Sequence, residues 1–432
     1  MTGPAPVADG AELDLGPADA DITDPDTYTQ GVPHATFLRL RKEDPVSWWE
    51  ETDGGHGFWA VTGYDDLLTV SRDVATYSSA QGIRLEEMTS EECDARRTIM
   101  ELDPPEHTRY RRLVSKPFSR REVYAYEQGI RLLARAVVDE ALPLRTFDFV
   151  DRIAKQLPMR MLGRLLGIPD ADGDWLVERG DALLGNTDPE MTDYPVGLSD
   201  TESFRMMPFR SPVHLDLFEY AERAAEERRA NPTDDVISDL LHPMVDGEQL
   251  SELEFKNFFT LMVAAGNDTT RYSVAAGMKA LLERPMVMAE LTDAVRRGDS
   301  ALVDSAVEEI IRWGTVTMHF RRTATHDTEL GGRSVNAGDK VVIWFVSADY
   351  DDTQFPDPFT FDIHRHPNDH VAFGRMSPHL CLGAQLARME VKVLFEELLP
   401  RISGARLVGP VERLRSNFIA GMKRLPIEVS LA

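Results

Sequence analysis

Cysteine, positive charge and long apolar runs are scarce in this chain, and each shortage excludes a class of protein. Cys93 and Cys381 are the only cysteines among 432 residues. Two cysteines cannot form the disulfide framework of a small secreted domain, so we expect a cytoplasmic location. Lys and Arg number 47 against 73 Asp and Glu, and the net charge of −26 argues against nucleic acids and anionic membranes as partners. No stretch of about 18 apolar residues occurs, so the sequence predicts no membrane span.

The remaining composition is that of a globular protein, with 42% hydrophobic and 28% charged residues. Residues 1–38 contain no Lys or Arg and are rich in Asp, Pro and Gly. We therefore expect residues 1–25 to form an acidic, loosely ordered segment on the surface. No internal repeat or low-complexity linker divides the chain, so residues 26–432 are expected to form one large domain.

The spacing of apolar residues predicts a mainly α protein with small β-sheets. Most of 105–285 shows helical periodicity, and residues 251–283 predict one long helix that Ser251 caps, with Glu254 three residues on. Residues 57–73 predict a strand followed by a helix, and residues 326–349 predict short strands around a Gly-Gly turn. Residues 80–102 and 185–212 predict long loops, which in compact proteins are usually functional lids or disordered.

The long helix has a polar interruption, "AAGNDTT", where its neighbours require burial. A buried carboxylate such as Asp268 is unfavourable unless it is paired or used in chemistry. Thr269 could simply bond a carbonyl one turn earlier, with Asp268 paired to a surface arginine. Gly266 favours a functional reason, because a central helix glycine costs about 1 kcal/mol relative to alanine and permits a close approach to the backbone.

Two further patterns concern charge. "EEIIRW" places Glu309 and Arg312 on one helix face, usually a modest surface pair, and the Pro-rich loop "FPDPFTFDIHRHP" adds Arg365. "HTRYRRLVSKPFSRREV" at 107–123 is strongly basic in an acidic protein. That basic face suggests an anion beneath it or an acidic partner above it, although a solvated helix face would look the same.

Cys381 lies in "HVAFGRMSPHLCLGAQLARMEV", between glycines and before a good helix-forming run. No second cysteine is near, so a structural zinc site is disfavoured. Three uses remain open: a catalytic thiol at a helix N-terminus, an inert core cysteine, or the thiolate ligand of heme iron.

Five segments, in this order, resemble the cytochrome P-450 family of heme-thiolate monooxygenases. They are "DPPEHTRYRRLVSKPF", "AGNDTT", "EIIR", the loop with Arg365, and "FGRMSPHLCLG", and the resemblance covers about residues 25–430. It implies the cytochrome P-450 fold, a single heme-enclosing domain, and heme b (iron protoporphyrin IX) as cofactor.

The resemblance assigns roles residue by residue. Cys381 matches the axial thiolate, and Asp268 with Thr269 matches the acid–alcohol pair that supplies protons during oxygen chemistry. Positions matching those that contact the heme are His107, Arg111, Gly266, Arg322, Phe373, His379 and Gly383. Glu309, Arg312 and Arg365 match a buried triad that supports the cysteine loop.

The chain departs from the common pattern in the cysteine loop. Phe373 is eight residues before Cys381, where seven is usual, a spacing that resembles members acting on steroid side chains and methyl-branched lipids. Those members usually have a glycine where this chain has "RMSP", and a proline where it has Val316. Both departures bear on the turn geometry of the loop and on the substrate.

The resemblance implies insertion of one atom of O2 into a C–H bond of a hydrophobic small molecule, such as a steroid, terpenoid, fatty or polyketide-like compound. Electrons would come from a ferredoxin, supplied by an NAD(P)H-dependent ferredoxin reductase. An acidic ferredoxin would suit the basic face near Arg109–Arg121, Arg375 and Arg388. The substrate contacts are expected around 80–100, 180–212, 261–265, 316–320 and 418–422. Candidate pocket residues are Met262, Ala265, Val316, Met318 and Ile419. A peroxygenase, a coupling or rearranging heme-thiolate enzyme, and a non-catalytic heme sensor remain as alternatives.

Overall fold

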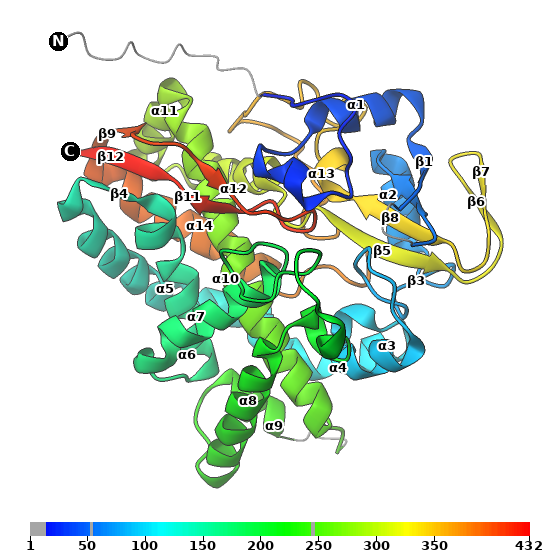
Figure 1. Cartoon of the computed structure of the whole chain (residues 1–432). Helices are drawn as coiled ribbons and strands as arrows, with labels where there is room; N and C mark the ends of the chain where they lie inside the picture. Colours follow the sequence, from blue (N-terminus) through cyan, green and yellow to red (C-terminus); the bar gives the residue numbers. More distant parts are fainter. Residues whose placement is uncertain (1–13, 52–54, 243–246) are drawn as a thin grey trace.

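A single long helix, α10 (Glu252–Leu282), runs through the centre of the molecule (Figure 1). The computed structural model of the chain describes residues 14–51, 55–242 and 247–432. Ser251 accepts a hydrogen bond from the Glu254 amide, and the Glu254 carboxylate accepts one from the Ser251 amide. This capping box satisfies two of the amides that a helix start leaves open, so the predicted cap is confirmed. Most sides of α10 are buried, which is why its sequence is apolar all round.

Helices pack on α10 from several directions. Contacts come from α6 (Gln156–Leu166), α7 (Asp170–Leu184), α8 (Val213–Ala230) and α12 (Ser300–Gly314). The other long helices are α5 (Arg120–Ala141), α11 (Pro285–Arg297) and α14 (Ala384–Leu398), and α14 packs along α5. Shorter helices are α1 (His34–Glu43), α2 (Tyr64–Arg72), α3 (Ser90–Arg96), α4 (Glu106–Val114), α9 (Val236–Leu241) and α13 (Phe345–Ala348). A π-helical turn, Val150–Ala154, precedes α6.

The largest sheet lies on the opposite side of the molecule from α5, α6 and α7 (Figure 1). It has five strands in the order β1 (Val46–Trp49), β2 (Phe58–Val61), β8 (Lys340–Trp344), β5 (His319–Ala324) and β3 (Tyr77–Ser78). β2 and β8 are parallel, and the other neighbours are antiparallel. A three-stranded sheet has the order β4 (Thr146–Asp148), β12 (Pro426–Leu431) and β9 (Ile402–Leu407). Two further sheets have two strands each, one pairing β10 (Glu412–Arg413) with β11 (Met422–Arg424) and the other pairing β6 (Thr328–Leu330) with β7 (Arg333–Val335). The prediction of a mainly α protein with small sheets is confirmed.

One predicted loop is wrong. Residues 80–102 were expected to be irregular, but they contain α3 and a short 3-10 helix, Ile99–Glu101. Thr89 caps α3 through a capping box with Glu92, and this signal outweighs the polar composition of the segment. The predicted break at 185–212 is confirmed, because it holds only the 3-10 turns Glu202–Phe204 and Pro208–Arg210.

The 185–212 segment is attached to α3. Arg205 Nε donates to Glu92 Oε1 at 2.8 Å, and Arg96 Nε donates to the Met207 carbonyl at 3.0 Å. These two contacts join segments about a hundred residues apart in the chain. They form one wall of the cavity described below.

Residues 1–13 of the expected N-terminal segment lie outside the described residues. Residues 14–25 contact α1: the Thr36 hydroxyl accepts from the Ala20 amide at 2.9 Å, and Ile22 is buried. No helix among the described residues is long and apolar enough to span a membrane.

Candidate active site

Cys381 lies three residues before α14, at the end of a tight loop. The Cys381 amide donates to the Phe373 carbonyl at 2.8 Å, and the Gly374 amide donates to the Val371 carbonyl at 2.7 Å. Gly374 and Met376 both have left-handed backbone conformations, with φ of 73° and 64°. The loop therefore closes without a glycine at Met376, and a side-chain residue takes the conformation that glycine adopts most easily.

The Cys381 thiol is open to an internal cavity although it lies deep in the molecule. Burial raises the pKa of the thiol, while the amides of Gly383 and Ala384 and the cations Arg111 and Arg388 act in the opposite direction. These amides and cations would stabilise a thiolate once a positive ion binds it.

The cavity around Cys381, which we call the proximal cavity, spans about 1720 Å³, including space open to solvent. It lies between α10 and the cysteine loop. All seven residues predicted to contact the heme line it: His107, Arg111, Gly266, Arg322, Phe373, His379 and Gly383. Thr269, from the predicted acid–alcohol pair, lines it too. Met262, Ala265 and Val316 line it as well.

The proximal cavity holds a cluster of basic groups that form no ion pair with an acid among the described residues, although Asp103 acts on His107 and Arg322 from nearby. The rings of His107 and His379 lie 4.3 Å apart, and Arg111 and Arg322 line the same cavity. His107 Nε2 and Arg322 Nε are buried without a hydrogen-bond partner. Burial, Arg322, His107 and Arg111 lower the pKa of His379 to about 2, and burial lowers the pKa of Arg322 to about 10.

These observations test whether the residues fit a heme. Unpartnered buried donors beside two arginines are unfavourable alone, and they match the two carboxylates of a heme. Apolar side chains such as Phe118, Phe258 and Leu386 line the rest of the cavity around the single thiol. The donor set therefore fits a thiolate-ligated heme.

Glu309, Arg312 and Arg365 meet in the interior. Arg312 donates to both carboxylate oxygens of Glu309, at 2.7 and 2.8 Å, and Arg365 Nε donates to Glu309 Oε2 at 3.1 Å. Glu309 and Arg312 are fully buried. The arginines also bind carbonyls of the Pro-rich loop, at Pro356, Pro358 and Thr360. A pair that could have lain on the surface thus fixes the loop that precedes the cysteine segment.

Thr269 and Asp268 face different surroundings. The Thr269 hydroxyl donates to the Ala265 carbonyl at 2.7 Å, one turn earlier, and the side chain lines the cavity. Asp268 does not line it: its Oδ1 accepts from Arg271 at 2.7 Å, and the same Arg271 nitrogen donates to Asp181 of α7 at 2.7 Å. Both local contacts considered from the sequence are present: Thr269 bonds a carbonyl one turn earlier, and Asp268 pairs with an arginine. That arginine, Arg271, is buried and does not lie on the surface, and Thr269 still faces the cavity.

The Asp268–Arg271–Asp181 cluster holds two carboxyl groups and one shared guanidinium. Burial, with help from the Asp181 carboxylate, raises the pKa of Asp268 well above its ordinary range even though Arg271 opposes the shift. Although burial opposes it, Arg271 and Lys155 lower the pKa of Asp181. Of the two carboxyl groups, Asp268 therefore holds a proton more readily than Asp181.

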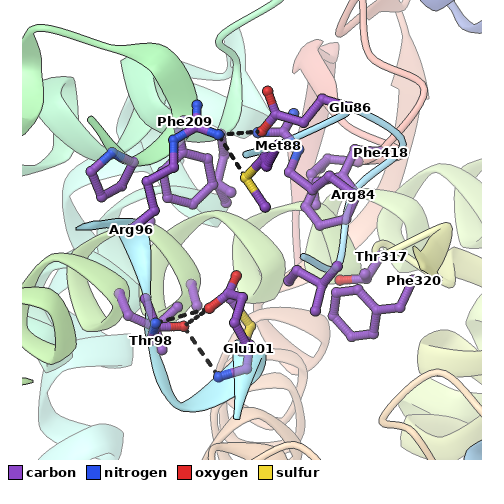
Figure 2. Close-up of a pocket in the computed structure, with 18 of the residues that line it drawn as sticks. Arg84, Glu86, Met88, Arg96, Thr98, Glu101, Phe209, Thr317, Phe320 and Phe418 are labelled. Carbon is purple, nitrogen blue, oxygen red and sulfur yellow. Dashed lines mark hydrogen bonds and ion pairs between the residues drawn. The ribbon is translucent and has the colours of Figure 1, made fainter. Parts of the chain in front are cut away.

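A second cavity, the distal cavity, spans about 810 Å³, including space open to solvent (Figure 2). It shares seven lining residues with the proximal cavity, so the two adjoin along α10, β5 and the segment that follows β3: Ile83, Met100, Leu261, Ala265, Thr269, Thr317 and Phe320. Its walls come from all five regions expected to contact a substrate, and Ile419 is among them. Most of the lining is apolar, including Leu184, Leu261, Phe209 and Phe418.

Met318 is the exception among the predicted pocket residues. It lines neither cavity and is fully buried in a core cluster with Phe37 and Trp344. The neighbouring Thr317 faces both cavities, whereas the Met318 side chain packs into that core cluster. Conversely, sequence reasoning did not single out Arg84, Arg96 or Glu101, which do line the distal cavity. Only their position in the 80–100 segment could have indicated them.

Comparison with known proteins gives consistent matches. The sequence profile of the Cytochrome P450 family matches residues 200–404. The methyl-branched lipid omega-hydroxylase of Mycobacterium tuberculosis is 37% identical, covering 98% of this chain and 96% of that protein. The steroid C26-monooxygenase of the same species is 34% identical, covering 95% of this chain and 93% of that protein. The structure of a Mycobacterium marinum cytochrome P450 in complex with pseudoionone is similar, with a TM-score of 0.83 and 34% sequence identity. The match covers 96% of this chain and 100% of that chain.

Proposed function

This chain belongs to the cytochrome P450 family, and on that premise we propose that it hydroxylates a C–H bond of a lipid- or steroid-like molecule held in the distal cavity. Membership makes the chain a monooxygenase and implies a thiolate-ligated heme. When bound, the heme would supply the oxidising chemistry. The protein residues would bind it, position the substrate and deliver protons.

In this proposal, Cys381 ligates the iron, and His107, Arg111, Arg322 and His379 hold the two heme carboxylates. The unpartnered donors of this group support that assignment. Asp268 holds a proton on the far side of α10, and Thr269 presents its hydroxyl oxygen to both cavities. A proton leaves Asp268 and reaches the cavity through Thr269 and water, a positioned transfer that contributes about 10²–10⁴-fold to rate.

One observation carries the choice of substrate class: an apolar distal cavity opens onto the Cys381 cavity at Ala265 and Thr269. A hydrophobic molecule in the distal cavity would expose one end at this junction and exclude water from it. The similarity to a methyl-branched lipid hydroxylase and to a steroid monooxygenase supports lipids and steroids over small polar compounds.

The test supplies the heme-loaded protein with NADPH, a ferredoxin, a ferredoxin reductase and isotopically labelled O2. Branched fatty acids, steroids and a macrolide polyketide are offered separately, and mass spectrometry detects products that carry one labelled oxygen. We expect labelled products from the lipid or steroid group, and none from Cys381→Ser. Turnover of the macrolide alone would contradict the proposed class.

We also propose a ferredoxin as electron donor, docking at the start of α5. Most basic residues first considered for this role are paired within the protein: Lys116 with Asp239 at 2.9 Å, Arg375 with Asp369 at 3.1 Å and Arg388 with Glu308 at 2.6 Å. Arg121 is 94% exposed, and its nearest acid, Glu122, is 4.0 Å away. Among the described residues, Arg120 forms polar contacts only with the hydroxyl and ring of Tyr124.

Charge reversal of both Arg120 and Arg121 should therefore slow reduction of the iron by ferredoxin, and added salt should have the same effect on the parent protein. Stopped-flow reduction rates measure both. Reversal of Arg39, which lies on α1, serves as the control. A rate independent of salt and of the double reversal would rule out this docking site.

A further inference from the structure

Arg84 is a cation without an acidic partner in the wall of the distal cavity. Its Nη2 donates to Asn186 Oδ1 at 3.0 Å, a neutral amide, and its Nη1 is buried without a partner. No carboxylate among the described residues forms an ion pair with it. A buried unpaired charge is unfavourable for folding, so its retention calls for an anion that the protein itself does not supply.

The surroundings hold Arg84 in place. Its guanidinium lies between two aromatic rings, 4.8 Å from the Phe418 centroid and 5.4 Å from that of Phe209 (Figure 2). Asn186 Nδ2 donates to the Phe209 carbonyl at 2.9 Å, which turns its oxygen toward Arg84. The backbone of Ile83 accepts from the Arg321 amide at 2.8 Å, which attaches the loop to β5. The cation is thus preorganised before any ligand arrives.

The other charged groups of this cavity leave Arg84 uncompensated. Arg96 pairs with Glu86 at 3.1 Å, so these two charges offset each other. Glu101 accepts from the amide and hydroxyl of Thr98, and burial raises its pKa, which favours its neutral form. The nearby His319 is buried, and burial with Arg84 lowers its pKa to about 3, so it adds no charge.

We propose that Arg84 binds a carboxylate of the substrate, which makes the substrate an elongated hydrophobic acid. The inference rests on the proposed function and deepens it. Arg84 lines only the distal cavity, whereas Thr269 lies at the junction with the proximal cavity. The carboxylate is therefore held in the distal cavity, and the C–H bond that reacts belongs to the part of the molecule that reaches the junction. The free Nη1 and the guanidinium plane between two rings suit a charged hydrogen bond to a carboxylate.

The experiment compares two ligand pairs, each an acid and an uncharged analogue of the same skeleton: isopalmitic acid with isopalmityl alcohol, and lithocholic acid with its methyl ester. Binding to the heme-loaded protein is followed by the spectral shift and by calorimetry. A charged hydrogen bond corresponds to about a ten- to hundredfold preference for the acid. Arg84→Gln should remove this preference by weakening only the acid. Arg223→Gln is the control, since Arg223 also lies over an aromatic ring, that of Tyr220, but outside both cavities.

Each result decides between interpretations. If the neutral partners bind as tightly as the acids, or the acid preference survives in Arg84→Gln, the inference is wrong while the proposed function stands. If Arg84→Gln weakens acid and neutral ligands equally, Arg84 only supports the loop and the inference is also wrong. If no member of either pair binds, the proposed substrate class fails, and the inference fails with it.

Discussion

At the scale of single residues, the protonation of Asp268 depends on Asp181. Asp181→Asn removes the negative charge beside Asp268 while Arg271 remains, so the pKa of Asp268 should fall. A proton donor with a lower pKa gives up its proton at a lower pH, so the enzyme that depends on it loses activity at a lower pH. We expect the alkaline limb of the pH–rate profile to move to lower pH in Asp181→Asn. Asp216→Asn, at an aspartate that contacts Arg179 on the surface, should leave the limb in place.

Thr269 supports a second prediction at this scale. Its hydroxyl already donates its proton to the Ala265 carbonyl, so within the cavity the hydroxyl oxygen can act only as a hydrogen-bond acceptor. Thr269→Ala should still bind substrate and accept electrons, but the ratio of product to NADPH consumed should fall and hydrogen peroxide should rise. Thr292→Ala removes the same one-turn bond from α11, and it should change neither quantity. An unchanged ratio in Thr269→Ala would show that the hydroxyl serves only the helix.

At the scale of elements, the buried triad joins α12 to the Pro-rich loop. Glu309→Ala leaves two buried guanidinium groups without their carboxylate, and breaking such a pair costs about 3–5 kcal/mol. We expect protein with little heme, or insoluble chain, as measured by heme content and yield. Glu290→Ala removes an exposed partner of His364 in the same loop, and it should alter stability by no more than about 0.5 kcal/mol.

The cysteine loop supports a prediction of opposite sign. Met376 has a φ of 64° and is 55% exposed, so its side chain adds strain and little packing. Met376→Gly should raise the free energy of unfolding by about 1 kcal/mol, because glycine adopts this conformation without steric penalty. Met286→Gly, at an exposed helical position of α11, should lower it. Urea unfolding of both variants measures the difference.

Elements with a local signal were predictable, and contacts between distant segments were not. The cap of α10 is a four-residue pattern that indicated where the helix starts, and the apolar run after it indicated the length of the helix. The same pattern at Thr89 was passed over because the surrounding residues are polar, and α3 was missed. The Glu309 triad could be suspected from order in the chain, yet its burial depends on a loop more than fifty residues away. The pairing of Asp268 with Asp181 and the lone charge of Arg84 depend on packing between helices and loops, which no local spacing encodes.

At the scale of the whole molecule, buried neutral histidines predict sensitivity to acid. Both ring nitrogens of His214 and His319 lack partners, and burial first, then nearby cations, lowers each pKa from 6.5 to about 3. Below pH 6.5 the unfolded chain binds protons that the folded chain does not, so stability falls as pH drops toward 3. At pH 5 each histidine contributes about 2 kcal/mol to this loss.

Urea unfolding at pH 7, 6 and 5 should show this decline in the parent protein. His214→Phe and His319→Phe should each reduce the decline by about 2 kcal/mol. His326→Phe is the control, because His326 is exposed and its ring is in water in both states. A decline of equal size in all four proteins would place its origin in other groups.

The contacts that join α3 to the 185–212 segment determine how long a molecule remains inside. Arg96, Pro208 and Phe209 belong to these two segments and line the distal cavity. We expect a bound molecule to leave when the Arg205–Glu92 and Arg96–Met207 contacts open, so that its residence time follows the rate of that opening. Two ligands of different affinity would then share this opening rate and differ in how often each is recaptured before it leaves the opened cavity. Dissociation is a property of the covering segments as much as of the ligand.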